Sequence, residues 1–219
     1  MENNWDGIMR PELLSEECLR VRTKLADHAK AYDWPAVFSI LSQSADLVNA
    51  CRPGGKSLYT PLHQAAHAGA SVETVFRLIQ MGAWRTLQNA RGERAADVAE
   101  RMGHRHLQHA LEPVLKHRVP MGILLKIQSH FHEVIRNRID ALIPSHELRL
   151  PELEILLELE QPQMWFRVPG MYGGFGYHLE SFGADAKLVV ESWCRVVEGS
   201  GERHEITTSG SRLVEKGFV

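Results

Sequence analysis

The spacing of apolar residues is helical through the first two thirds of the chain and alternating in the last third. Up to residue 144, apolar residues recur every three or four positions in short successive segments, which predicts helices. Beyond Gln163 the period becomes two, and turn-forming residues separate five strand-like segments, 164–168, 175–180, 186–197, 203–208 and 212–219. The pattern predicts an α+β protein in which a helical array is followed by a small antiparallel sheet.

The longest predicted helix, residues 119–143, has one apolar side and one polar side. Its apolar side consists of Leu124, Ile127, Phe131, Val134, Ile135 and Leu142, and its polar side includes Arg136, Asn137 and Asp140. Pro144 is expected to end it, and acidic residues crowd the stretch that follows. We therefore expect a helical domain at residues 1–144, with this helix and a helix at 11–24 as its two caps, and a β-rich domain at residues 145–219.

A twelve-residue stretch, YTPLHQAAHAGA at residues 59–70, contains the pattern T-P-L-H-x-A. Thr60 is placed to cap a helix, Pro61 occupies its first position, and Gly69 is placed to end it. The stretch 25–32 is similar to 62–69, and a weaker third copy follows about 34 residues later. We therefore predict three helical units, of which the middle one is the best formed.

These residues resemble an ankyrin-repeat protein over about residues 24–114. The glycine- and aromatic-rich C-terminal tail resembles that of bacterial ankyrin-repeat proteins. The resemblance implies stacked helix pairs that bind partners through loop tips and through exposed positions of the first helices. It also implies a structural role for His63, which resembles a histidine that hydrogen-bonds loop backbone. The implied contact residues are Arg52, Lys56, Tyr59, Gln64 and His67 in the middle unit, and Trp84, Arg85, Gln88, Arg91, Glu93 and Arg94 after it.

Two aromatic positions have two interpretations each. Trp84 is either a binding residue at a loop tip or a side chain packed beneath the neighbouring loop. Tyr172, in the glycine-rich stretch 164–175, is either a contact residue or part of a hairpin, and we include it among the candidates. Trp165 and Phe175 in the same stretch are predicted to be core residues of that hairpin. The glycine spacing does not match a dinucleotide-binding loop.

Composition narrows the choice of function. A net charge of −2 over 219 residues argues against nucleic-acid binding as the main role. Three widely separated cysteines and the lack of a long apolar run indicate a cytoplasmic protein that does not bind membranes. We expect no cofactor and no metal, because neither histidine group, His104, His106 and His109 or His130 and His132, has a metal-ligand spacing.

The sequence therefore favours a non-catalytic protein that binds another protein. The ankyrin resemblance suggests an immunity protein that binds and occludes a toxin, with the acidic stretch 152–160 imitating an anionic substrate. A general adaptor or a self-associating structural protein is the alternative. A hydrolase is less favoured, and its site would combine Glu191, Arg195, His204 and Glu205 in the sheet, without a recognised catalytic motif.

Overall fold

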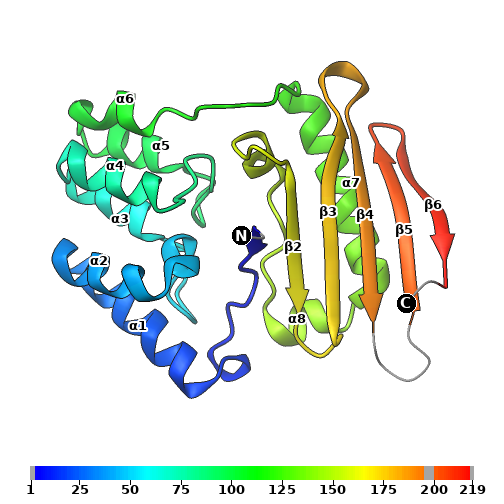
Figure 1. Cartoon of the computed structure of the whole chain (residues 1–219), viewed down its shortest axis with the longest axis horizontal. Coiled ribbons are helices and arrows are strands. Elements are labelled where there is room, and N and C mark those ends of the chain that lie inside the picture. Colours follow the sequence, from blue (N-terminus) through cyan, green and yellow to red (C-terminus); the bar gives the residue numbers. More distant parts are fainter. Residues whose placement is uncertain (1–2, 195–199, 218–219) are drawn as a thin grey trace. The chain divides into compact units, whose positions relative to one another are not determined.

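The computed structural model describes residues 3–194 and 200–217 and has the predicted α+β class, with helices followed by a six-stranded, mostly antiparallel sheet (Figure 1). The chain forms two compact units. One unit spans Met9–Val114, and the other combines Met1–Ile8 with Leu115–Val219. Each unit is described separately below.

Three consecutive helix pairs make up the unit Met9–Val114. The pairs are α1 (Glu16–Lys30) with α2 (Trp34–Gln43), α3 (Pro61–Ala68) with α4 (Val72–Gln80), and α5 (Ala95–Arg101) with α6 (Gln108–Leu111). Short 3₁₀ turns lie at η1 (Pro11–Leu13), η2 (Ala45–Asn49) and η3 (Arg105–Leu107). Helix α3 packs against both α1 and α5, so the first helices of successive pairs are neighbours.

The three pairs share one feature of backbone geometry. Each first helix is followed by a residue in the left-handed region, with φ of 61° at Tyr32, 62° at Gly69 and 79° at Gly103. These three positions are equivalent in the sequence comparison of the units. Glycine adopts this conformation without steric cost, whereas tyrosine does not. Tyr32 is therefore the exception among three equivalent positions.

The start of the helical unit differs from the expectation. A separate capping helix at residues 11–24 was predicted, but Pro11–Leu13 form only a 3₁₀ turn. Ser15 then accepts a hydrogen bond from Cys18 N and caps α1, which continues to Lys30. The predicted cap and the first helix of the first unit are thus one helix, because no helix-ending residue interrupts that stretch.

The core of the middle pair is formed as predicted. Leu62, Ala65 and Ala66 of α3 are buried, as are Val75 and Leu78 of α4. The alanines let neighbouring helices approach closely, and the larger residues fill the space between the paired helices.

The second unit contains one sheet of six strands among its described residues, in the order β1-β2-β3-β4-β5-β6. The strands are β1 (Asn4–Trp5), β2 (Gln163–Val168), β3 (Gly173–Ser181), β4 (Lys187–Cys194), β5 (Ser200–Thr207) and β6 (Gly210–Lys216). β1 pairs with β2 in parallel, and the other neighbours are antiparallel. Each predicted strand segment overlaps one of β2 to β6. β1 was not predicted, because two residues are too few to show a period.

Helix α7 (Met121–Ile139) packs on this sheet and contacts β4, β5 and β6 (Figure 1). The ring centroid of Phe131 lies 4.9 Å from that of Tyr177 in β3. The expected boundary at residue 144 is therefore corrected to Leu115, because the apolar side of α7 is buried within the sheet unit. The helix also ends earlier than expected, and Pro144 lies inside the short helix α8 (Leu142–His146).

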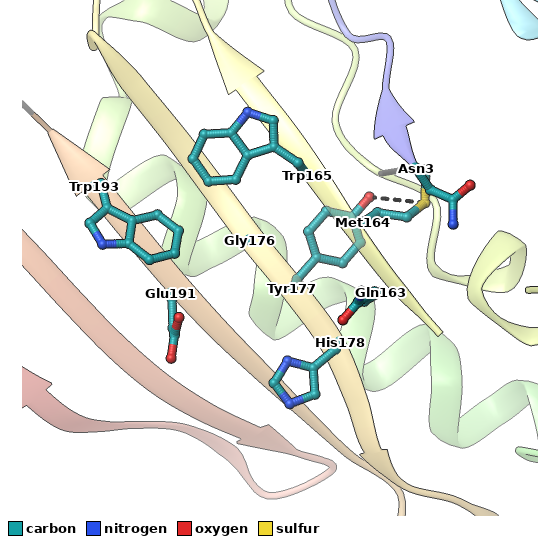
Figure 2. A pocket seen from close by; sticks show the side chains of 9 residues that line it. All are labelled: Asn3, Gln163, Met164, Trp165, Gly176, Tyr177, His178, Glu191 and Trp193. Atoms are coloured by element: carbon teal, nitrogen blue, oxygen red, sulfur yellow. Dashed lines mark hydrogen bonds between the residues drawn. The ribbon is translucent and has the colours of Figure 1, made fainter. Parts of the chain in front are cut away.

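Alternation along β2 assigns its residues to two faces of the sheet. Met164, Phe166 and Val168 are buried on one face, and Trp165 between them points to the other (Figure 2). Phe175 is a fully buried core residue, as predicted. The prediction that Trp165 is a core residue is wrong, since its neighbours in β2 occupy the core face.

The acidic stretch 152–160 presents less charge than the sequence suggested. It contains the 3₁₀ helix η4 (Leu153–Leu157), whose residues are all buried, including Glu154. Arg149 forms an ion pair with Glu152, and Lys116 forms one with Glu160. Of the acidic side chains expected to imitate an anionic substrate, Glu154 is thus buried, whereas Glu160 is paired but remains 82% exposed.

Candidate binding surface

Aromatic side chains from the first two helix pairs meet beside α3. The hydroxyl of Tyr32, just after α1, is 2.9 Å from Nδ1 of His67 in α3. The ring centroid of Tyr59, just before α3, lies 6.1 Å from that of His67. The structure thus brings together the predicted residues Tyr59 and His67 and adds Tyr32.

An ion pair extends this cluster to the third helix pair. Arg101, at the end of α5, donates from Nη2 to the hydroxyl of Tyr59 at 3.1 Å and from Nε to Oε1 of Glu93 at 2.7 Å. The bond from Arg101, followed by one from Asn89, lowers the pKa of Glu93 from 4.5 to about 2. We call Tyr32, Tyr59, His67, Glu93 and Arg101 the tyrosine network.

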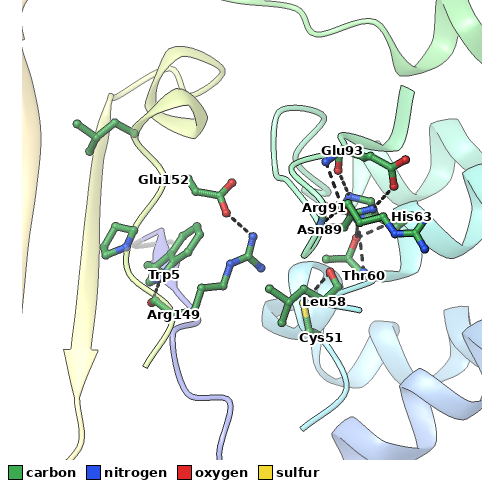
Figure 3. A network of polar contacts seen from close by, with 12 residues as sticks. Trp5, Cys51, Leu58, Thr60, His63, Asn89, Arg91, Glu93, Arg149 and Glu152 are labelled. Carbon is green, nitrogen blue, oxygen red and sulfur yellow. Dashed lines mark hydrogen bonds and ion pairs between the residues drawn. The ribbon is translucent and has the colours of Figure 1, made fainter. Parts of the chain in front are cut away.

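The loop before α5 is held in one conformation by Asn89 (Figure 3). Its side-chain oxygen accepts hydrogen bonds from the backbone N–H groups of Arg91, at 2.7 Å, and of Glu93, at 3.1 Å. Its amide nitrogen donates to Oε2 of Glu93 at 2.8 Å. Arg91 is therefore an exposed side chain on an ordered loop, as a contact residue requires.

His63 has the structural role that the ankyrin resemblance implied (Figure 3). The imidazole is buried, with Nδ1 2.9 Å from Oγ1 of Thr60 and Nε2 3.2 Å from the carbonyl oxygen of Glu93. The backbone N–H of Thr60 also lies 3.4 Å from Nδ1. These partners indicate the tautomer that donates from Nε2 and accepts at Nδ1. His63 therefore links the cap of α3 to the loop that carries Glu93.

Three other candidates in the middle unit lie around the same helix. Arg52 forms an ion pair with Asp27 of α1. Lys56 is exposed in the loop before α3, and Gln64 is half-buried on α3 itself. Arg52 is thus engaged within the unit, while Lys56 remains accessible.

The candidates that follow α4 are anchored mainly through backbone groups. The N–H of Trp84 donates to Oδ1 of Asn49 at 2.9 Å, and its half-buried side chain fits both interpretations of this residue. Arg85 donates from Nε to the carbonyl of Ala110 at 3.1 Å, which ties the loop to α6. Gln88 is half-buried, and Arg94 is the N-cap residue of α5.

Tyr172 lies in the connection between β2 and β3, in the other unit. Its side chain is 76% exposed, and its φ of 49° is left-handed. Such exposure excludes a core role and leaves Tyr172 as a candidate contact residue separate from the tyrosine network.

The residues of the alternative hydrolytic site are divided between the two faces of the sheet. His204 and Glu205 are adjacent in β5, so their side chains point to opposite faces. Glu191 shares the face of Glu205, since it pairs with Arg203 in register. Burial lowers the pKa of His204, Arg138 acts in the same direction, and Glu202 opposes it. Arg195 lies outside the described residues.

The histidines considered as metal ligands mostly bond to backbone carbonyls. Nε2 of His104, His106 and His132 lies within 3.1 Å of the carbonyl oxygens of His67, Ala70 and Pro151, respectively. Across residues 3–194 and 200–217, no three His, Cys, Asp or Glu side chains form a group able to hold a metal ion. The described helices include none that is both long and apolar enough to cross a bilayer.

Sequence reasoning missed two members of the tyrosine network, Tyr32 and Arg101. The signal for Tyr32 was its alignment with Gly69 and Gly103, because a bulky residue at a glycine position is unusual. Arg101 gave no comparable signal, since a basic residue in the last turn of a helix is common.

No family model matches this chain, and a search of curated proteins also gives no match. Among solved structures, one match is a chain from a structure described as a predatory endopeptidase from Bdellovibrio bacteriovorus in complex with an immunity protein. The two chains are 28% identical, with a TM-score of 0.34. The match covers 40% of this chain and 42% of that chain, so less than half of either is compared.

Proposed function

We propose that this protein is a non-catalytic binding module of the ankyrin-repeat type and that the tyrosine network is part of its protein-binding surface. The conformation of Tyr32 carries the proposal. Tyr32 holds a left-handed conformation that glycine holds at both equivalent positions, and its side chain is 43% exposed. A strained residue that gains little burial is a candidate for a functional role.

The geometry around Tyr32 suits recognition of another protein. Its ring stacks with those of Trp34 and His67, at centroid distances of 6.3 Å and 6.4 Å. Arg101, which is paired with Glu93, bonds to the hydroxyl of Tyr59, and the ring of Tyr59 also lies close to His67. Tyrosine, tryptophan and arginine dominate binding energy at interfaces, and side chains that are already ordered lose less entropy on binding.

The repeated left-handed positions and the capping box of Thr60 and His63 support the ankyrin assignment. The separation of His204 from Glu191 and Glu205 supports a non-catalytic role. We further propose that the partner is a toxin that this protein occludes, in the manner of ankyrin-fold immunity proteins. Such a role requires one tight complex of large area.

A co-expression experiment tests this proposal. The full chain is produced with the product of the neighbouring reading frame, and cell growth and the dissociation constant of the complex are measured. We expect one tight complex and restored growth. Several weak partners would indicate a general adaptor, and the lack of any complex would contradict the toxin assignment.

Two variants test the surface itself. Tyr32→Gly should weaken binding at least about tenfold, while the free energy of unfolding stays constant or rises by up to about 1 kcal/mol because the left-handed strain is relieved. Arg91→Ala should also weaken binding, and Arg136→Ala, which removes another exposed arginine, this one on α7, is the matched control. Unchanged affinity of Tyr32→Gly would show that the tyrosine network is not the interface, and unchanged affinity of Arg91→Ala would exclude the loop before α5 from it.

A further inference from the structure

Two tryptophans lie together on the face of the sheet opposite α7. Trp165 in β2 and Trp193 in β4 flank the central strand β3, and their ring centroids are 5.4 Å apart (Figure 2). In register, Trp165 is opposite Gly176 and Trp193 is opposite Gly174. Each indole thus has a glycine as its partner on β3.

The two glycines make room for the indoles. A Cβ at Gly174 would lie 2.8 Å from Cζ2 of Trp165 and 2.2 Å from the backbone oxygen of Phe166. A Cβ at Gly176 would lie 3.3 Å from Cζ3 of Trp193. Glycine weakens a strand and often marks a place where another group approaches closely. Here it lets the two rings meet across β3 as an apolar platform, with their planes inclined at 41° to each other.

Polar side chains border this platform (Figure 2). Gln163, His178 and Glu191 line the same pocket as Trp165 and Trp193, and the pocket has a volume of about 260 Å³. Drug-sized ligands occupy pockets of roughly 300–1,000 Å³. The volume therefore suits a ligand with a single ring.

The charge of the pocket indicates what kind of ligand fits. Oε1 of Glu191 is 3.7 Å from Nε of Arg203, and both side chains are about one-third exposed, at 35% and 38%. The negative charge of Glu191 and the positive charge of Arg203 cancel, so this pair has no net charge. The pocket therefore offers hydrogen-bond donors and acceptors without favouring an ionic ligand. A neutral ligand with several hydroxyl groups satisfies such a set of side chains.

We propose that this pocket binds a single neutral sugar ring. The apolar C–H face of the sugar stacks on the platform of Trp165 and Trp193, and its hydroxyls bond to Glu191, Gln163 and His178. An apolar wall with a few polar groups at its edge is the usual arrangement of small-molecule sites. This site is separate from the tyrosine network and does not depend on the function proposed for it.

Titration of the full chain by NMR tests the proposal. Glucose, galactose, mannose and N-acetylglucosamine are added to ¹⁵N-labelled protein, and the five indole N–H signals are followed. We expect at least one sugar to shift the signals of Trp165 and Trp193 saturably in the millimolar range, while the signals of Trp5, Trp34 and Trp84 do not move. Tetramethylammonium and glucuronate serve as cationic and anionic probes.

Variants assign the response to the pocket. Trp193→Ala should abolish saturation, and Glu191→Gln, which keeps the size of the side chain, should weaken binding about tenfold or more. Glu180→Gln, at an exposed position of β3, is the matched control and should leave affinity unchanged. The proposal is overturned if no sugar saturates, if an ionic probe binds in place of every sugar, or if Glu191→Gln binds as well as the unaltered chain.

Discussion

The two units present aromatic side chains in different ways. In the helical unit, Tyr32 and Tyr59 are held by polar bonds to His67 and Arg101. In the sheet unit, Trp165 and Trp193 contact each other over glycines of β3. A surface fixed by directional bonds suits recognition of one protein partner, whereas an apolar platform with a polar edge suits a small ring. The two proposed sites therefore differ in how each holds its aromatic side chains in place.

The units also differ in how they are stabilised. The helical unit relies on short helices whose ends are capped, as at Thr60 and Ser71. The sheet unit relies on α7, which covers one face of strands that are distant from it in sequence. We therefore expect core substitutions to have the largest effect in the sheet unit and cap substitutions to matter most in the helical unit.

Removal of the Phe131 side chain should have the largest effect on stability. This residue is fully buried on α7 and contacts Tyr177 across the interface between helix and sheet. Phe131→Ala should lower the free energy of unfolding by about 3–5 kcal/mol, because it leaves a cavity that the sheet cannot close. Urea unfolding followed by circular dichroism measures the loss.

The control for this prediction is Phe76→Ala, which removes the same side chain from a position that is 42% exposed on α4. We expect a change of about 0.5 kcal/mol or less in the control. If Phe131→Ala lowered the free energy of unfolding no more than Phe76→Ala does, the packing of α7 on the sheet would not stabilise this unit.

The helical unit was more predictable than the sheet unit because its signals are local. Thr60, Pro61 and Gly69 specify the two ends of α3 within a few residues, and the structure places them as expected. Helix 119–143 was also recognised from its apolar side, but the sequence could not show which unit that side packs against. Helical periodicity indicates that a face is buried and gives no information about its partner.

The candidate site shows the same limit. Tyr59, His67 and Glu93 were predicted from their positions in the repeat, whereas Arg101 joins them only through the folding of the third helix pair. Trp165 was assigned to the core because aromatic residues in strands are often buried. Its actual face depends on the register of β2, and a shift of one residue exchanges the two faces of a strand.

The loss of His63 should have an intermediate effect on stability. His63→Ala removes the bonds to Thr60 and to the carbonyl of Glu93, and it leaves buried polar groups without these partners. We expect the free energy of unfolding to fall by about 1–3 kcal/mol. Thermal unfolding measures the change, and His109→Ala, at an exposed position of α6, is the control. Equal melting temperatures for the two variants would contradict a structural role for His63.

The smallest effect that we predict depends on pH and involves Glu93. Its folded-state pKa of about 2 lies below the ordinary value of 4.5, so the charged carboxylate stabilises the fold. This contribution is fully present above about pH 4.5 and is lost as the pH falls towards 2. Because Arg101 is 37% exposed and solvent screens the pair, we expect Glu93→Gln to cost only about 1 kcal/mol at neutral pH.

The pH dependence of the unfolding free energy distinguishes the contribution of this ion pair from a general destabilisation by acid. The difference in unfolding free energy between Glu93→Gln and the unaltered chain should shrink as the pH falls from about 4.5 to about 2. Glu100→Gln, at an exposed position of α5, should show no such convergence. A difference for Glu93→Gln that stayed constant over this range would mean that the charge of Glu93 does not hold Arg101, and hence Tyr59, in the tyrosine network. The helical surface would then be ordered by packing, as the tryptophan platform of the sheet is.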